Sequence, residues 1–382
     1  MQDQEQSHTT SSFHLCVSVK NMVNLFDYSL SQLQEYFLSI DEQKFRAIQV
    51  FRWIHVYGII NFDDMTDIAK SLKTKLKTVT IIKAPTIIKE IIANDGVYKW
   101  IIDLGNNNQI ETIFIPEDNR GTLCISSQVG CALECTFCST GRQGFNRNLT
   151  TGEIISQIWL ANKQLGYFDN KSNNRIITNV VLMGMGEPLA NYHNVINAIN
   201  IMLDNNAYSL SKRKVTLSTS GIIPKIIQLA NDCPISLAVS LHASNDDIRS
   251  QIIPLNIKYP IKDLIAACKI YLLKSAKDYV TFEYVMLDNV NDKFEHAREL
   301  IEQVKNINCK FNLIPFNSFP NSGYKSSSMS HIIQFQKILQ QADIVTTIRK
   351  TRGEKIDAAC GQLVGNVLDK TKRAQKWNIV QI

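Results

Sequence analysis

Between residues 123 and 341 the chain alternates between short segments of branched apolar residues and longer segments with the spacing of amphipathic helices. The strand-like segments are residues 123–126, 176–183, 214–219, 235–241, 279–285 and 310–315. The helix-like segments are residues 152–165, 191–204, 222–230, 260–273, 291–307 and 329–341. Asn191 and Asn291 suit N-cap positions. Strands that alternate with helices of this length form parallel βαβ units. Six or so units predict an α/β fold, an open, partial (βα)6 barrel rather than a closed barrel of eight strands.

The residues outside this alternation predict further parts of the chain. We expect a disordered N-terminus over residues 1–20, a small helical accessory domain with a strand-rich link over 21–100, the partial barrel over 101–350 and a C-terminal segment over 351–382. The first of these is polar and short of branched apolar residues, a composition that is typical of disorder.

The accessory domain has a helical pattern between residues 24 and 78, where apolar residues recur three and four positions apart. Ser29 and Asp41 are expected N-caps of two of its helices. Phe45, Phe51 and Trp53 stand beside arginines. They could contact nucleic acid, but core packing is the more common use of such aromatic side chains.

Three cysteines lie close together in the run Cys131-Ala-Leu-Glu-Cys135-Thr-Phe-Cys138. Three thiolates from one loop can hold three irons of a cubane cluster and leave the fourth iron without a protein ligand. The alternative is a structural zinc site, which needs four closed ligands and usually a second Cys-x-x-Cys pair. No second pair occurs in this sequence. The spacing is similar to that of the radical SAM superfamily, in which the open iron is chelated by S-adenosylmethionine (SAM).

Further unusual residues stand at the carboxyl ends of the predicted strands, where barrel enzymes place their active sites. The Gly184–Pro188 turn follows the second strand, and polar residues end the third, fourth and sixth. The resemblance to radical SAM proteins implies that seven residues contact SAM: Gly186, Glu187, Ser218, Ser240, Leu241, His242 and Asn317. His242 alone would as readily be a satisfied buried histidine.

Two more cysteines differ from the rest in their surroundings. Cys124 lies on the first predicted strand, and Cys360 lies in the run Ala-Ala-Cys-Gly-Gln-Leu, among small residues that can bend. An exposed thiolate is a strong nucleophile that can accept a methyl group from SAM. The other isolated cysteines are interpreted as small core residues, namely Cys16, Cys233, Cys268 and Cys309.

Taken together, these runs resemble the RlmN/Cfr family of RNA adenine methyl synthases. The resemblance is carried by residues 121–149, 179–189, 240–243 and 359–363. It covers nearly the whole chain after the first twenty or so residues. The helical N-terminal part and the length are similar to the RlmN branch rather than to the shorter Cfr branch.

The resemblance implies a dual-specificity methyltransferase. Its substrate would be carbon 2 of adenosine, in 23S rRNA at the peptidyl-transferase centre and in tRNA at the adenosine 3′ of the anticodon. Cys131, Cys135 and Cys138 would hold one [4Fe-4S] cluster whose open iron coordinates SAM, and each turnover would use two SAM molecules. Carbon 2 is flanked by two ring nitrogens and is electron-poor, so it cannot attack a methyl sulfonium, and radical chemistry is needed.

The same resemblance assigns three catalytic residues. Cys360 would be methylated by the first SAM, and its methylene radical, formed with the second SAM, would add to carbon 2 and tether the RNA to the protein. Glu111 would accept the carbon 2 proton, a role that suits a carboxylate with a raised pKa in a dry pocket. On sequence alone, a surface glutamate at a strand edge is the more common interpretation. Cys124 would then attack the Cys360 sulfur, releasing methylated RNA and leaving a transient Cys124–Cys360 disulfide.

Charge and composition add expectations about partners. The net charge is +6, and residues 343–382 carry eight basic and four acidic side chains. Such a stretch favours contact with an RNA or DNA backbone, although on charge alone a solvated surface is equally common. No secretory signal pattern and no apolar run of spanning length is present, so we expect a cytoplasmic protein without membrane contact. We further expect a monomer that receives electrons from a flavodoxin-like donor.

Three other functions stay open at this point. A Cfr-type enzyme would methylate carbon 8 of adenosine in 23S rRNA instead. A radical SAM activase would generate a glycyl radical on a protein partner and would not need Cys124 and Cys360. An RNA-binding iron–sulfur protein without catalysis would bind RNA and leave SAM intact.

Overall fold

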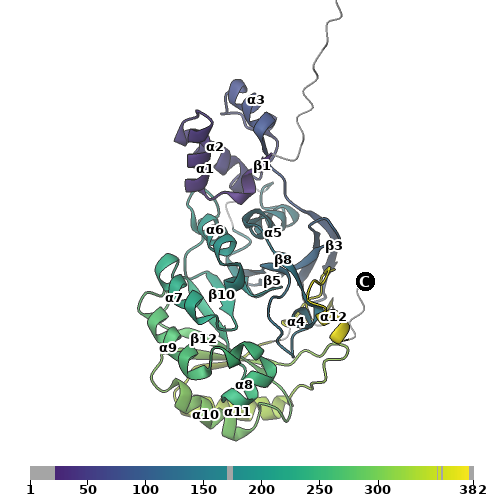
Figure 1. Ribbon diagram of the computed structural model, residues 1–382, viewed down its shortest axis with the longest axis vertical. Coiled ribbons are helices and arrows are strands. Elements are labelled where there is room, and N and C mark those ends of the chain that lie inside the picture. Colours follow the sequence, from purple (N-terminus) through teal and green to yellow (C-terminus); the bar gives the residue numbers. More distant parts are fainter. Residues whose placement is uncertain (1–21, 170–174, 351, 354–355, 378–382) are drawn as a thin grey trace, which may run out of the picture.

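The computed structural model describes residues 22–169, 175–350, 352–353 and 356–377 (Figure 1). The expected disorder of residues 1–20 falls outside these residues. Figure 1 shows the helical N-terminal region at one end of the molecule and helices around the outside of a central sheet. None of the described helices combines the length and the apolar character needed to cross a bilayer.

One sheet forms the centre of the fold. Within the described residues it has ten strands in the order β14-β13-β12-β11-β10-β9-β6-β5-β4-β3. Seven neighbouring strands are parallel: β6 (Arg120–Cys124), β9 (Asn179–Leu182), β10 (Val215–Thr219), β11 (Ser236–Ser240), β12 (Val280–Met286), β13 (Cys309–Pro315) and β14 (Thr346–Ile348). The six predicted strands are confirmed, and β14 is an addition. Because β14 and β3 lie at opposite edges, the prediction of an open, mostly parallel α/β barrel is confirmed.

The strand-rich link continues the same sheet. Strands β3 (Thr86–Ile92), β4 (Tyr98–Asp103) and β5 (Gln109–Glu117) run antiparallel, and β5 pairs with β6. The prediction of strands is confirmed, and their hydrogen bonds make them an extension of the barrel rather than a separate connection. This extension places β5 directly beside the strand that carries Cys124.

The six predicted barrel helices are also confirmed. They are α5 (Thr151–Gln164), α6 (Tyr192–Leu203), α7 (Ile223–Asp232), α9 (Ile261–Leu272), α10 (Phe294–Val304) and α11 (Met329–Gln341). Asn191 is the N-cap residue of α6, as predicted. The prediction for Asn291 is wrong, because Lys293 is the N-cap residue of α10. The Asn291 amide instead donates to the carbonyl oxygens of His242 and Val285, at 2.7 and 2.6 Å.

The remaining elements are short and lie mostly in the loops. The strands are β1 (Val23–Asn24), β2 (Thr80–Ile81), β7 (Gln128–Gly130) and β8 (Phe145–Asn148). The helices are α4 (Ser139–Gln143), α8 (Asp246–Ile252), α12 (Arg373–Lys376) and the 3-10 turns η2 (Leu25–Asp27), η3 (Phe62–Asp64), η4 (Pro188–Asn191) and η5 (Pro254–Ile257). Figure 1 shows the C-terminal segment, in yellow, beside α4.

The N-terminal region contains α1 (Leu30–Ser39), α2 (Lys44–His55) and α3 (Lys70–Val79). Ser29 caps α1, as predicted. The prediction for Asp41 is wrong, because α2 begins only at Lys44 and Asp41 has a left-handed φ of 58°. Phe51 is fully buried, in line with core packing, whereas Phe45 is 52% exposed.

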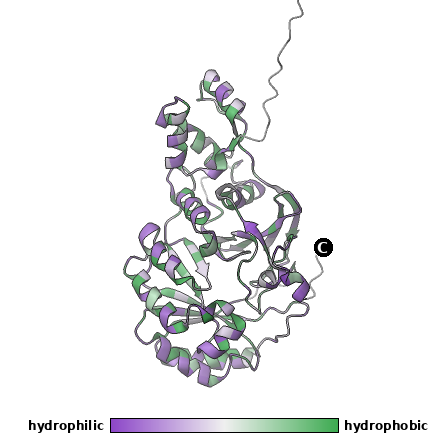
Figure 2. Cartoon of the chain, viewed as in Figure 1, coloured by the Kyte–Doolittle hydropathy of each residue, from purple (hydrophilic) through white to green (hydrophobic). Residues whose placement is uncertain are grey.

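Apolar residues of the sheet and of the inner helix faces form one continuous core. Figure 2 shows hydrophobic and hydrophilic residues alternating along the outer helices, as expected for helices that bury one face. The N-terminal helices join this core, since Trp159 Nε1 of α5 donates to the Ile54 carbonyl at 3.0 Å.

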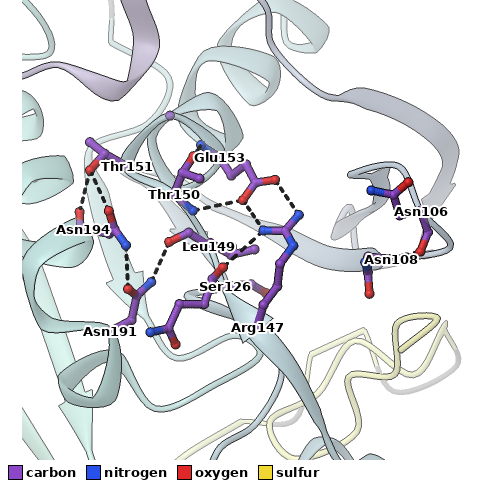
Figure 3. A network of polar contacts seen from close by, with 12 residues as sticks. Asn106, Asn108, Ser126, Arg147, Leu149, Thr150, Thr151, Glu153, Asn191 and Asn194 are labelled. Atoms are coloured by element: carbon purple, nitrogen blue, oxygen red, sulfur yellow. Dashed lines mark hydrogen bonds and ion pairs between the residues drawn. The ribbon is translucent and has the colours of Figure 1, made fainter. Parts of the chain in front are cut away.

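The loop that precedes α5 is fixed by a polar network (Figure 3). Glu153 closes a capping box with Thr150 and pairs with the Arg147 guanidinium through two contacts of 2.7 Å. The Asn191 amide donates to the carbonyl oxygens of Ser127 and Leu149, at 2.9 and 2.8 Å. These bonds tie both ends of the cysteine-bearing loop to the start of α6.

Candidate active site

A cavity of about 150 Å³ opens at the carboxyl ends of the parallel strands. Its lining holds nine of the residues to which the sequence assigned cluster or SAM binding, namely Cys131, Cys135, Cys138, Gly186, Glu187, Ser218, Ser240, His242 and Asn317, and also Cys360. Parallel strands present their carboxyl ends at one edge, which is why segments far apart in sequence meet here. We call this space the main cavity.

Three of the predicted site residues do not line the main cavity. Leu241 is fully buried, and its carbonyl oxygen accepts a hydrogen bond from Arg249 Nε at 2.9 Å. Cys124 lines a smaller adjoining cavity, which Cys360 also lines. Glu111 lines neither of the two. The roles assigned to all these residues stay predictions.

Local backbone hydrogen bonds shape the loop that carries the three cysteines. Cys131 N–H donates to the Gly144 carbonyl at 2.8 Å, and Cys138 N–H donates to the Cys135 carbonyl at 3.1 Å. Burial, and then the neighbouring thiols, raises the pKa of Cys131 and raises that of Cys135 to about 12. Such thiols would stay protonated at neutral pH unless a cationic group lay between them.

These donors fit an iron–sulfur cluster. Metal charge deprotonates coordinating thiols outright. Among the residues that the structure describes, no three Cys, His, Asp or Glu side chains are grouped for a single metal ion. A cubane spreads its cysteine ligands over different irons, so it does not require that grouping. Cys131, Cys135 and Cys138 are therefore the residues that would hold the cluster.

The turn after β9 packs tightly against the cysteine loop. Gly186 has a φ of 102°, and a Cβ there would lie 2.5 Å from Gln128 Cβ. Gln128 Oε1 accepts from the backbone N–H groups of Ala132 and Glu187, both at 3.0 Å. Gln128 thus joins the cysteine loop to the glycine turn, a role that its sequence position does not signal.

Glu187 uses its carboxylate to hold the strand ends together. Its two oxygens accept from Leu189 N–H at 3.1 Å and from Ser220 N–H at 2.8 Å. Burial raises the pKa of the Glu187 carboxyl. The hydrogen bonds lower this pKa, but the effect of burial is larger. Because the carboxylate is occupied, the backbone of this turn is the part that can offer acceptors to a ligand.

His242 is a neutral side chain at the cavity wall. Its Nδ1 accepts from Val285 N–H at 3.0 Å, which leaves the proton on Nε2. Burial, and then Arg249, lowers the pKa of His242 to about 3. A neutral imidazole can donate a hydrogen bond to a bound molecule without adding charge.

Arg249 is a buried cation that sequence reasoning missed. It donates to the carbonyl oxygens of Ser220 and Ser240, at 2.8 and 3.0 Å, and so bridges the ends of β10 and β11. In the sequence it stands in a charged helical run and looks like an ordinary surface arginine.

Cys360 and Cys124 are free thiols that share the smaller cavity with Arg349. Cys360 is the main cause that raises the pKa of Arg349, and Glu283 and Cys124 raise it further against the effect of burial. Burial, and then Cys360, raises the pKa of Cys124 to about 12. Cys360 lines both cavities and therefore stands between the three-cysteine site and Cys124.

Glu111 lies on β5, 2% exposed, rather than at a sheet edge. Its carboxylate pairs with Lys99 Nζ at 2.6 Å and accepts from Val364 N–H at 3.2 Å. Burial raises the pKa of Glu111 to about 7, although Lys99 lowers it. The burial of Glu111 and its raised pKa agree with the expectation, but the side chain lies outside both cavities.

Some basic residues between positions 343 and 382 line the smaller cavity, and others contact the cysteine loop. Lys350 and Arg352 line the smaller cavity together with Arg349. Arg373 is buried against the cysteine loop, and Lys376 pairs with Glu134 at 2.7 Å. Arg373 and Lys376 thus have partners within the protein, and the expected contact of this stretch with nucleic acid stays a prediction.

Comparisons with known proteins agree with this arrangement. Residues 23–82 match the ribosomal RNA large subunit methyltransferase N-terminal domain, and residues 125–301 match the radical SAM superfamily. The crystal structure of a radical SAM methyltransferase from Sphaerobacter thermophilus is 38% identical, with a TM-score of 0.83, over 89% of this chain and 99% of that chain.

More distant structures include SuiB from Streptococcus suis bound to S-adenosylmethionine. It is 14% identical, with a TM-score of 0.43, over 62% of this chain and 55% of that chain. The two domain matches and the 38% identity to a methyltransferase over most of both chains decide the family. The chain belongs to the radical SAM methyltransferases and carries the N-terminal domain of the RlmN family.

Proposed function

We propose that this chain methylates carbon 2 of adenosine in 23S rRNA and in tRNA, with Cys360 as the carrier of the methyl group. The observation that carries the proposal is the position of Cys360, which lines both the three-cysteine cavity and the cavity of Cys124. A methyltransferase that moved the methyl group directly from SAM to RNA would need neither thiol.

The bound cluster and SAM would supply the methyl group and the radical chemistry that an electron-poor ring carbon requires. The protein's own residues would supply the rest. Cys360 would take the methyl group and become linked to carbon 2 through the methylene. Glu111, which is buried and has a raised pKa, would accept the carbon 2 proton. The unpaired electron of the adduct would be returned to the cluster that supplied one electron at the start, which leaves a closed-shell thioether.

Cys124 would complete the cycle. Attack of its thiolate on the Cys360 sulfur would form an S–S bond and break the S–CH2 bond. The electron pair of that broken bond would enter the adenine ring, and the methylene would take up a proton to become the methyl group. The shared cavity favours this pairing of the two thiols. A reductant would then restore both of them.

Several features support an RNA substrate. The N-terminal domain is of the ribosomal RNA methyltransferase type. Lys350 and Arg352 line the smaller cavity beside Cys360. Their positive charges favour contact with the phosphates of RNA. An adenosine must leave a base stack before its ring carbon can enter such a cavity, so we expect single-stranded or loop adenosines.

The test is nucleoside mass spectrometry of 23S rRNA and tRNA after anaerobic incubation with reconstituted protein, SAM and a reductant. 2-Methyladenosine that disappears in Cys360→Ala would support the proposal. 8-Methyladenosine would move the activity to the Cfr type. If the protein still cleaves SAM but forms neither product, an RNA adenine substrate would be refuted.

A further inference from the structure

The segment that carries Cys360 is tied to the sheet by one buried ion pair. Lys99 on β4 and Glu111 on β5 meet at 2.6 Å, with side chains that are 7% and 2% exposed. Both strands belong to the antiparallel extension, outside the parallel strands that form the main cavity.

The two members of this pair hold opposite ends of the segment. Lys99 Nζ donates to the carbonyl oxygens of Ile356 and Asp357, at 3.1 and 3.2 Å. Glu111 Oε2 accepts from Val364 N–H at 3.2 Å. Cys360 lies midway between the two ties. The ion pair and its three backbone bonds therefore hold the two ends of the segment, while Ser139 N–H and Thr140 Oγ1 hold its middle by donating to the carbonyl oxygens of Gly361 and Leu363, at 2.8 and 2.7 Å.

The strength of these ties depends on the charge of Glu111. An ionised carboxylate attracts Lys99 and is a strong acceptor for the Val364 N–H, because charge-assisted bonds are stronger than neutral ones. A protonated carboxyl loses both advantages and leaves Lys99 as a buried cation without a counter-charge. Asp357 is the other charged group that acts on Glu111, and it raises the pKa of that carboxyl.

We propose that Lys99 and Glu111 form a latch on residues 356–364, which seats Cys360 for methyl transfer and stays open once Glu111 has accepted a proton. Lys99 is then a positioning residue of the reaction. This inference rests on the proposed function, because it assigns the proton of the RNA step to Glu111.

The latch also explains why Glu111 lines neither cavity. A partial shift of the segment is needed before the carboxylate can meet carbon 2 of a bound adenosine. The proton that it takes there removes the charge that would draw the segment back. Cys360 then keeps the freedom to reach Cys124, and loss of the proton to solvent closes the latch for the next cycle.

The first experiment measures hydrogen exchange of the peptide that contains Val364, in the reconstituted full chain with SAM and without RNA. Lys99→Met and Glu111→Gln should speed exchange of the Val364 amide by roughly tenfold, the effect of losing one hydrogen bond. Lys99→Arg, which keeps the cation, should restore most of the protection. Lys262→Met is the matched control, since Lys262 is an exposed lysine on α9.

The second experiment follows methylation of RNA against pH. Removing the Lys99 cation raises the pKa of Glu111. The acidic limb of the rate profile should therefore move to higher pH in Lys99→Met, whereas Lys99→Arg should show the limb at its wild-type position. A lysine that only stabilised the fold would lower the yield of active protein without moving this limb. If Lys99→Met folds poorly, the double variant Lys99→Met/Glu111→Met removes both charges and should still show the faster exchange.

The outcomes separate the two proposals. Normal Val364 protection or an unmoved pH limb in Lys99→Met, with RNA methylation intact, would overturn the latch and leave the function standing. The opposite result has two parts: Lys99→Met loses the Val364 protection, and the wild-type protein methylates no RNA. That result would support the contact of Lys99 and Glu111 with the segment but overturn the proposed function and the protonation step.

Discussion

Arg373 Nη2 lies 2.8 Å from the carbonyl oxygen of Cys131. The same guanidinium donates to the carbonyl oxygens of Leu133 and Gly141, at 2.7 and 3.1 Å. One side chain of the C-terminal segment therefore holds three points of the cysteine loop. The loop that would carry the cluster and the segment that carries Cys360 are fixed to each other.

We predict that Arg373→Met destabilises the fold by about 2–4 kcal/mol, because three carbonyl oxygens in buried or partly buried hydrogen bonds lose a charged donor. The loosened loop should also retain less iron after anaerobic reconstitution. Thermal unfolding and iron content are the measurements. Lys376→Met is the control, since its exposed pair with Glu134 contributes less than about 1 kcal/mol. Equal losses in both variants would contradict a specific role for Arg373.

Replacing either of the two thiols in the smaller cavity should block the reaction, each at a different step. Cys360→Ala should form no methylated RNA, because the methyl carrier is missing. Cys124→Ala should accept the methyl group and join the RNA, but it should accumulate a covalent RNA–protein adduct that denaturing electrophoresis detects. Cys309→Ala, at the half-buried start of β13, should keep activity. Turnover at the wild-type rate in Cys124→Ala would rule out the resolving role.

The general position of the site could be predicted from the sequence because it follows from topology. Alternating strands and helices force parallel pairing, and the residues after each strand then meet at one edge. His242 after β11 and Asn317 after β13 lie in the cavity lining for that reason. The cysteine spacing predicted a common site for Cys131, Cys135 and Cys138, and these three residues line the same cavity.

The supporting residues could not be predicted, because their roles come from contacts across the fold. Gln128, Arg249 and Arg373 look like ordinary polar residues in the sequence, yet each binds backbone groups of other elements. Strand β14 has only three residues, too few for a periodic pattern. Nothing in the sequence of β5 indicates that it pairs with β6 and so places Glu111 behind the Cys360 segment.

The pKa of Glu111, raised from 4.5 to about 7, predicts two pH effects. A general base acts when ionised, so RNA methylation should rise as the pH passes through about 7. Stability should move the other way, because between about pH 4.5 and 7 the native carboxyl keeps a proton that the unfolded chain has lost. Its contribution to stability then falls with rising pH, by about 3 kcal/mol at most.

Glu111→Gln provides the check on both effects. The variant should lose the methylation step, and it should lose this part of the pH dependence of unfolding, measured by denaturant titration across that range. The exposed Glu295→Gln is the control and should leave both profiles unchanged. A rate profile that is flat around pH 7 in the wild type would exclude Glu111 as the proton acceptor.

Gly186 tests whether the turn after β9 needs a glycine for space as well as for conformation. Gly186→Ala should cost about 2–5 kcal/mol, because its φ of 102° strains any side chain and a Cβ would press on Gln128. A shifted Gln128 would disturb both the cysteine loop and the turn, so SAM affinity should fall at least roughly tenfold.

Gly166→Ala is the matched control, since Gly166 also has a positive φ, of 70°, but open space at its Cβ. That variant should cost only about 1 kcal/mol and bind SAM normally in equilibrium dialysis. Similar SAM affinity in the two variants would show that the contact with Gln128 does not shape the site.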